Sequence, residues 1–390
     1  DLYTKAAEKA GGELVAVTHN PLDAVWDNQP AAPISPIIPH DISYAGISSI
    51  NKRQELAKSL AKDGIDAAVL TLPDSIAWLL NVRGSDVQHT PLPLSYAVLH
   101  NNGAVDWFVD QRKLSPGLIE TLGNAVAVQP LASFGEMLEA LAAKSAKIKA
   151  DPATAAAYVF DRLEGAEIVR GEDPCTLPKA LKNDVEVTGT RIAHTRDGKA
   201  LTRFLSWLAV TACSGGLTEI AASDRLRAFR SETGALRDLS FPTISSSGPN
   251  GAIVHYNATE ETNREIGENE LYLVDSGAQY LDGTTDVTRT VAIGTPSAEM
   301  KDRFTRVLKG HIAIATARFP EGTTGAQLDT LARASLWQAG LDFDHGTGHG
   351  VGSYLGVHEG PHRISKGGGG VALQPGMVVS NEPGYYKAAS

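Results

Sequence analysis

ELYLVDSGAQYLDGTTDVTRTVAIG, residues 270–294, decides the fold of the C-terminal half of this chain. Apolar and β-branched residues flank the turn signal Leu281-Asp282-Gly283, which is typical of a β-hairpin. Folding the segment about residues 280 and 281 places Asp275 opposite Asp286, and directly opposed residues have Cβ atoms about 4.5–5.5 Å apart. Carboxylates that close repel unless a cation or a proton lies between them. The hairpin therefore predicts the floor of a divalent metal pair; the alternative is two aspartates that cap turns and face water.

A second stretch, HGTGHGVGSYLGVHEGPH at 345–362, holds four of the eleven histidines of the chain. Neutral imidazole binds metals and transfers protons near neutral pH. His345 and His349 have the spacing of one helix face, but the glycines around them make a helix improbable there. The glutamate of a helical HExxH motif is also absent. The stretch therefore predicts a site on an irregular loop; the alternative for any one histidine is a structural hydrogen bond.

Two shorter motifs each present one candidate residue. In SNEPGYY, residues 380–386, Pro383 restricts the preceding residue to extended geometry, so Glu382 can project from a strand end into a cleft. In AIVHY, His255 follows three apolar residues that read as a strand, which would direct its imidazole at a site. The alternatives are a solvated surface carboxylate for Glu382 and a histidine that closes a sheet edge for His255.

The composition limits the class of protein. The net charge of −10 argues against nucleic acid as a partner, because phosphate binding needs a basic surface. No run of about eighteen apolar residues is present, so the sequence predicts no membrane span. Two cysteines in 390 residues are no disulfide framework and fit a reducing compartment, which predicts a cytoplasmic protein.

The order of local signals predicts the domains. The segment 26–41 contains four prolines and predicts a linker rather than a helix or an inner strand. Residues 49–64 then predict a helix, 65–73 a short strand, and Asn102-Gly103 the turn of a hairpin. We expect an α/β domain at 41–178, with residues 1–40 as the remnant of an earlier domain and its linker.

A second α/β (α+β) domain is expected at 179–390. Residues 196–213 and 217–234 predict helices, followed by two strand-rich segments punctuated by glycine. Thr324 to Ala339 predict a further helix, with Gly340 as its stop signal.

Taken in order, the motifs at 240–256, 273–290, 345–361 and 380–386 resemble the aminopeptidase P (Xaa-Pro aminopeptidase) group of the pita-bread metallopeptidases, in its larger three-domain type. The resemblance covers about residues 30–390 and includes WLLNVRG at 78–84. It implies a C-terminal pita-bread catalytic domain that follows a creatinase-N-like α/β domain.

The resemblance also implies the roles of seven residues. Four are implied ligands of two divalent metal ions, chiefly Mn²⁺ with Zn²⁺ or Co²⁺ as substitutes: Asp275, Asp286, His349 and Glu382. Three histidines are implied to bind the substrate: His255, His345 and His358. Of these seven, His255, His358 and Glu382 are implied to act in catalysis.

The implied reaction is hydrolysis of the N-terminal Xaa–Pro bond by a metal-bridging hydroxide, with peptides that carry proline at position 2 as substrates. The family also has a fifth ligand, a glutamate on a strand after the EPGYY turn, which lies beyond Ser390; we therefore expect a C-terminally incomplete catalytic domain and a possible homodimer. The alternatives are a prolidase-like dipeptidase, a metal-free hydrolase of the creatinase kind and a catalytically inactive binding module. Because Asp275, Asp286 and Glu382 are all present, the last two are disfavoured.

Overall fold

A computed structural model describes residues 2–15, 17, 19–115, 117–367 and 370–387 of the chain. It divides into two compact units, Asp1–Ile34 and Ser35–Ser390. The first unit contains the helix α1 (Leu2–Lys9). Among the described residues, no helix is both long enough and apolar enough to cross a membrane.

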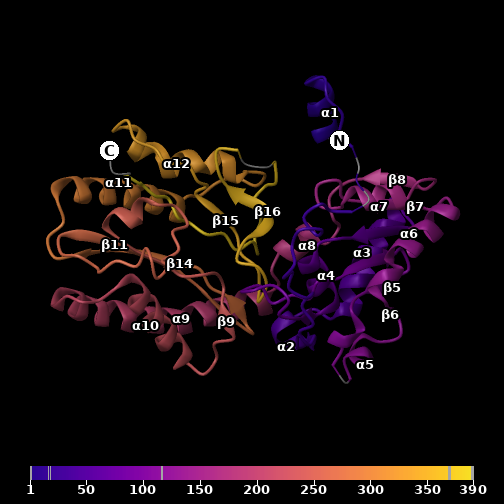
Figure 1. Ribbon diagram of the computed structural model, residues 1–390, viewed down its shortest axis with the longest axis horizontal. Coiled ribbons are helices and arrows are strands. Elements are labelled where there is room, and N and C mark those ends of the chain that lie inside the picture. Colours follow the sequence, from indigo (N-terminus) through magenta and orange to yellow (C-terminus); the bar gives the residue numbers. More distant parts are fainter. Residues whose placement is uncertain (1, 16, 18, 116, 368–369, 388–390) are drawn as a thin grey trace. The chain divides into compact units, whose positions relative to one another are not determined.

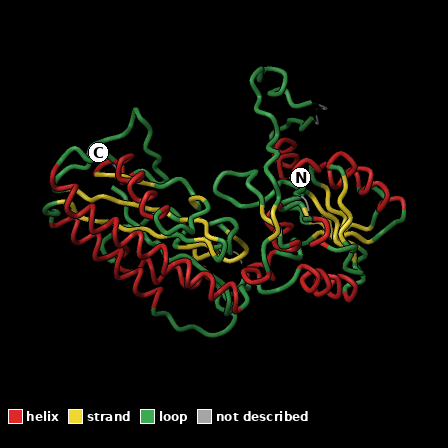
Figure 2. Tube along the Cα trace, turned by 90° about the horizontal axis from the view of Figure 1, so that it is seen from below, coloured by secondary structure: helices red, strands yellow, loops and turns green. Residues whose placement is uncertain are grey.

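The N-terminal part of the second unit is built on a six-stranded mixed sheet with the order β6-β5-β4-β2-β7-β8. Its strands are β2 (Ala67–Leu70), β4 (Tyr96–His100), β5 (Val105–Phe108), β6 (Val126–Gln129), β7 (Lys147–Ala150) and β8 (Glu167–Arg170). The α-helices of this part are α2 (Ile42–Ala45), α3 (Ser49–Lys62), α4 (Pro73–Leu80), α5 (Leu118–Leu122), α6 (Phe134–Ala143), α7 (Ala157–Arg162) and α8 (Thr176–Ala180). Figure 2 shows helices on both sides of these strands.

Both faces of this sheet are buried, as the side-chain alternation of β2 shows. Ala68 and Leu70 pack with residues of α3, α4 and α5 in one hydrophobic cluster. Ala67 and Val69 pack with residues of α6 and α7 in another. Since successive side chains of a strand point to opposite faces, a sheet covered by helices on both faces needs the continuous apolar run that β2 has.

The sequence predictions for this part are confirmed in their main features. The hairpin β4–β5 turns at Asn102-Gly103, where Gly103 has a φ of 85°. The predicted helix begins at Ser49, but Ser48 is its N-cap, because the Ser48 hydroxyl accepts the amide of Asn51. The proline-rich segment contains only the two-residue strand β1 (Ile38–Pro39), which pairs with β3 (Val82–Arg83).

The C-terminal part places a three-stranded antiparallel sheet, in the order β10-β11-β14, against two long helices. Its strands are β9 (Asp238–Leu239), β10 (Ile244–Ser247), β11 (Glu270–Ser276), β12 (Ala278–Tyr280), β13 (Gly283–Thr284), β14 (Val287–Ile293), β15 (Gly348–Gly350) and β16 (Glu359–Ile364). Its α-helices are α9 (Asp184–Thr211), α10 (Glu219–Ser231), α11 (Ala298–Ala315) and α12 (Gly325–Trp337). Figure 1 shows β11 and β14 between the α9–α10 pair and the α11–α12 pair.

Local signals set the helix ends in this part. The capping box of Asn183 and Glu186 starts α9 at Asp184, twelve residues before the predicted start at 196. Thr324 caps α12, and Gly340 follows it with a φ of 69°, as the stop signal predicts. The mixed α/β class with two successive α/β parts is therefore confirmed.

Candidate metal centre

The hairpin at 270–294 forms, but its register differs from the predicted one. Asp275 pairs with Thr288 in the β11–β14 ladder, and Tyr280 pairs with Gly283 in the β12–β13 ladder. The turn is therefore centred between Leu281 and Asp282, one residue later than predicted. Direct opposition of Asp275 and Asp286 was wrong: Asp286 lies two residues before Thr288 and is a diagonal neighbour of Asp275, still within side-chain reach.

A glycine explains why the long ladder breaks beside these aspartates. A Cβ on Gly277 would lie 2.0 Å from the Thr285 carbonyl oxygen and 2.0 Å from the Ser240 hydroxyl. This close approach of two backbones separates β11 from β12, so Asp275 and Asp286 both lie near the interruption. A break in a sheet is a common place for side chains to be directed at a site.

Three of the four predicted ligands lie together. The Nε2 atom of His349 is 3.3 Å from Asp286 Oδ2 and 3.0 Å from Glu382 Oε1. One ligand atom from each residue lies within 4.8 Å of the other two, and all three side chains are half-buried. They come from the short segment between β13 and β14, from β15 and from the segment after Met377.

Backbone pairing brings Glu382 to β15. The Ser380 amide donates to the His349 carbonyl at 2.8 Å, and the Glu382 amide donates to the Thr347 carbonyl at 2.8 Å. The Ser380 hydroxyl accepts the His349 amide at 2.9 Å and donates to Glu382 Oε1 at 2.7 Å. The extended geometry expected before Pro383 thus lays residues 380–382 alongside β15.

The fourth predicted ligand, Asp275, has a buried carboxylate oxygen without a hydrogen-bond partner among the described residues. Its Oδ1 atom is buried and accepts no hydrogen bond from any described residue. Burial, and after it the nearby Asp286 carboxylate, raise the pKa of Asp275 to about 7. Buried carboxylate oxygens are normally paired, so an oxygen left without a partner marks a place where a cation fits.

His349 is oriented in the way that a metal ligand requires. Its Nδ1 atom lies 2.9 Å from the Gly350 carbonyl, so the Nδ1–H of a neutral ring donates there and leaves the Nε2 lone pair facing the carboxylates. Burial alone would lower the pKa of His349, but the hydrogen bonds with Asp286 and Glu382 raise it to about 10. A proton on Nε2 thus lies between the two carboxylates, at the position where a cation would bind. Burial would raise the pKa of Glu382, but the hydrogen bonds from His349 and Ser380 lower it.

The remaining predicted histidines border this cluster. The ring of His358 lies edge-on to that of His349, with centroids 4.3 Å apart. Partial burial and the charge of His349 lower the pKa of His358. His345 Nε2 accepts the Tyr386 hydroxyl at 2.9 Å, and its Nδ1 lies 2.7 Å from the Gly346 carbonyl.

The strand predicted before His255 is wrong. A 3-10 helix, Gly248–Ala252, ends at the first of the three residues of that predicted strand, and the chain then bends and turns, so that His255 is an exposed residue with a φ of 58°. Pro249 removes a backbone donor directly after β10, so the ladder ends at Ser247 and the chain turns. His255 is nevertheless among the groups whose charge lowers the pKa of His358, which keeps it in electrostatic range of the cluster.

Sequence reasoning assigned no role to Tyr386, although it lies in the quoted SNEPGYY motif. Burial raises the pKa of Tyr386 to about 12, with the carboxylates of Glu382 and Asp275 acting in the same direction. Its hydroxyl is therefore protonated and donates to His345. The signal available in the sequence was the position of Tyr386 four residues after the candidate ligand Glu382.

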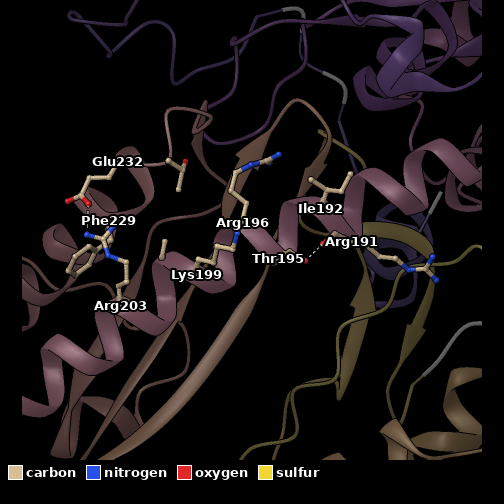
Figure 3. A pocket seen from close by; sticks show the side chains of 10 residues that line it. Arg191, Ile192, Thr195, Arg196, Lys199, Arg203, Phe229 and Glu232 are labelled. Carbon is tan, nitrogen blue, oxygen red and sulfur yellow. Dashed lines mark hydrogen bonds and ion pairs between the residues drawn. The ribbon is translucent and has the colours of Figure 1, made fainter.

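A separate cavity of about 580 Å³ runs along α9 and α10 and is drawn in Figure 3. Its lining includes Arg196, Lys199 and Arg203 from α9, with Phe229 and Glu232 on the α10 side. Arg203 pairs with Glu232 at 2.7 Å, and Arg196 pairs with Asp282 at 2.9 Å. None of the residues that line it belongs to the metal cluster, so this groove is distinct from the candidate centre.

Comparison with known families gives two matches along the chain. Residues 188–390 match metallopeptidase family M24, and residues 28–186 match the creatinase/prolidase N-terminal domain. These matches agree with the fold class expected from the sequence.

Relatives cover nearly the whole chain. Aminopeptidase P1 of Arabidopsis thaliana is 38% identical over 99% of this chain and 67% of its own length. A probable Xaa-Pro aminopeptidase P of Paracoccidioides brasiliensis (strain Pb03) is 43% identical over 98% of this chain and 65% of its own length. This chain thus spans about two thirds of the length of these relatives.

A solved structure shares the fold. The X-prolyl aminopeptidase of Caenorhabditis elegans, described as a cytosolic enzyme with a di-nuclear active site, superposes with a TM-score of 0.91 at 38% identity. The match covers 98% of this chain and 64% of that one. The chain therefore belongs to metallopeptidase family M24, and its relatives confirm the predicted resemblance to the aminopeptidase P group.

Proposed function

We propose that the protein is a metal-dependent aminopeptidase that releases the first residue from peptides with proline at position 2. The observation that carries the proposal is the orientation of His349, whose Nδ1 is held by the Gly350 carbonyl while Nε2 faces Asp286 and Glu382. The names of two relatives supply the substrate class, since one is a probable Xaa-Pro aminopeptidase P at 43% identity and the other an X-prolyl aminopeptidase at 38% identity.

The residues present fit two divalent cations. We propose that Asp275, Asp286, His349 and Glu382 hold them, with manganese as the cellular metal and zinc or cobalt as substitutes. Carboxylate oxygens with a single imidazole suit these ions better than copper. Such ions would polarise the scissile carbonyl and lower the pKa of the attacking water.

The side chains around the ions have separate tasks in the proposed reaction. Glu382 accepts the proton of the attacking water while Ser380 steadies its Oε1 atom. His358 or His255 donates a hydrogen bond to the oxyanion, a contribution typically worth roughly 10²–10³ in rate. His345, with its ring fixed by Tyr386, contacts the substrate together with these two histidines.

The proline nitrogen of an Xaa–Pro bond carries no hydrogen. A site for this bond therefore has no use for an acceptor that binds an amide N–H at the scissile position. This chemistry supports a pocket in which histidines contact the carbonyl side of the bond.

We also propose that residues 41–178 form a supporting α/β domain and that residues 179–390 form the catalytic domain. A cytoplasmic location, no nucleic-acid or membrane partner, and a homodimer complete the proposal. The C. elegans protein is described as cytosolic, which supports the location.

A prolidase-like dipeptidase is the second candidate. The Xaa-Pro dipeptidase of Bacillus anthracis has the same fold, with a TM-score of 0.71 at 24% identity. The higher identity to the aminopeptidases favours an aminopeptidase, whereas an inactive binding module is disfavoured by the intact cluster of three ligand side chains.

Metal content and cleavage, measured together on the whole protein and on this 390-residue chain, test the proposal. We expect two metal ions per whole protein and manganese-dependent release of the first residue from Xaa-Pro-Xaa tripeptides. Cleavage of Xaa-Pro dipeptides alone would favour the dipeptidase. A whole protein that binds no metal and cleaves neither substrate would overturn both.

A further inference from the structure

The segment that joins His349 to His358 is held by side chains from distant parts of the sequence. We define this joining loop as residues 351–358; within it the Gly352 amide donates to the Gly356 carbonyl at 3.0 Å. It follows β15 directly and ends at a histidine whose ring contacts that of His349. The position of His358 therefore depends on what holds this loop.

Arg83, from WLLNVRG, is one anchor. Its Nε donates to the Tyr354 carbonyl at 2.6 Å and its Nη2 to the Ser353 carbonyl at 3.1 Å. Its Nη1 donates to the carbonyls of Ala77 and Val82, at 3.2 and 2.9 Å, which fixes the guanidinium to α4 and β3. Each of these hydrogen bonds goes to a main-chain carbonyl, so a planar fork of donors joins two segments 270 residues apart.

The anchored backbone is strained. Tyr354 has a φ of 48°, which is unusual for a residue with a side chain and is energetically unfavourable. Its ring lies 5.9 Å from the Arg83 guanidinium and 5.7 Å from the ring of His40. A strained conformation persists only where surrounding contacts fix it, and Arg83 binds the carbonyl of this residue.

Gln279 is a second, independent anchor. Its side-chain amide donates to the Leu355 carbonyl at 2.7 Å and to the His89 carbonyl at 3.0 Å. Thr284 donates to Gln279 Oε1 at 2.8 Å, which orients the amide. Three successive carbonyls of the joining loop, those of residues 353, 354 and 355, are thus bound by the buried side chains of Arg83 and Gln279. The Thr284 hydroxyl lies 3.3 Å from the last of them.

We propose that Arg83 is a positioning residue for the proposed reaction, acting with Gln279 to fix the joining loop and thereby the ring of His358 beside His349. This inference rests on the proposed function for its catalytic meaning and on the contacts of Arg83 for its structural part. Through Arg83, the WLLNVRG motif acts at the metal cluster although it lies far from it in sequence.

Arg83→Lys in the whole protein tests the proposal, because lysine keeps the charge but cannot form the fork of hydrogen bonds. We expect kcat for an Xaa-Pro-Xaa peptide to fall by about 10–100-fold, as for other groups that orient catalytic side chains, with two metal ions retained and KM little changed. Hydrogen exchange at the amides of Gly352 and Leu355 should become faster.

Arg53→Lys is the matched control. Arg53 is equally buried and donates to a main-chain carbonyl, that of Gly103 at 2.7 Å, but it has no contact with the joining loop among the described residues. We expect comparable thermal destabilisation with unchanged kcat and unchanged exchange at Gly352 and Leu355.

Gln279→Met removes the other anchor and keeps the test valid if Arg83→Lys does not fold. Faster exchange in the joining loop in either anchor variant, but not in Arg53→Lys, supports the proposal. Unchanged exchange and kcat in a folded anchor variant, or equal effects in the control, overturns it. If the unaltered protein has no Xaa-Pro activity, the proposed function fails, whereas the exchange experiment still decides whether Arg83 holds the loop.

Discussion

Two clusters of charged side chains, one at β15 and the other at β16, differ in how their charge is balanced. Glu359 of β16 is fully buried with Lys182 and Lys179, and Lys179 also binds Asp74 at 2.7 Å. These two lysines and two carboxylates balance. The other cluster, around His349 of β15, contains three carboxylates and one imidazole.

The difference separates a structural cluster from a functional one within a single stretch of sequence. Gly350 pairs with Glu359 in the ladder, so the two clusters are neighbours in the fold. Figure 1 shows α8, which carries Lys179, next to β16. Where lysines neutralise the carboxylate, the protein needs no further cation; where the carboxylates outnumber the cations, an exogenous one fits.

The largest expected effect is on the unbalanced cluster. Asp275→Asn removes a carboxylate that is buried and repelled by the charge of Asp286, so we expect the metal-free protein to unfold at an equal or higher temperature. Loss of a metal ligand should lower metal content below two ions and reduce kcat/KM by on the order of 10³-fold, several kcal/mol. Metal analysis, peptide cleavage and thermal unfolding check this; a clear loss of metal-free stability would contradict it.

The balanced cluster should respond in the opposite way. Glu359→Gln leaves two lysines buried without their shared carboxylate, and removal of one partner from a buried ion pair costs roughly 3–5 kcal/mol. We expect the free energy of unfolding in urea to fall by about this amount, with metal stoichiometry of the folded fraction unchanged. Metal loss without destabilisation would show that the two clusters are not separate.

Acid should weaken the balanced cluster. Burial would raise the pKa of Glu359, but the charges of Lys182 and Lys179 lower it below its ordinary value of 4.5. A carboxyl with a depressed pKa in the folded state adds stability above its unfolded pKa, and this stability is lost as pH falls through the folded value. Urea unfolding between pH 6 and pH 3.5 should therefore show a smaller loss of stability in Glu359→Gln than in the unaltered chain. Parallel curves would contradict this assignment.

The smallest effect should come from an ion pair nearer the surface. Arg196 and Asp282 are in contact at 2.9 Å, with 26% and 14% of their side chains exposed. Since solvent screens such pairs, we expect Asp282→Asn, which keeps the turn chemistry, to cost at most about 1 kcal/mol. A cost as large as that of Glu359→Gln would show that burial does not explain the difference.

The sequence by itself determined those features whose causes lie within a few residues. The turn at Asn102-Gly103, the start of α12 after Thr324 and its end before Gly340, and the extended backbone before Pro383 follow from local backbone chemistry. The glycines around His345 and His349 likewise excluded a helix, and the structure has loops and a short strand there.

Tertiary structure decided what depends on contacts between distant segments. The register of β11 and β14 was misjudged because the turn is centred one residue later than predicted, between Leu281 and Asp282, and His255 turned out to lie in a turn because β10 ends at Ser247. No local pattern predicted that lysines almost 180 residues away would neutralise Glu359. Likewise, none predicted that Arg83 would bind the loop before His358. A long-range ion pair or hydrogen bond is fixed only by the packing that excludes water around it, and this packing exists only in the folded chain.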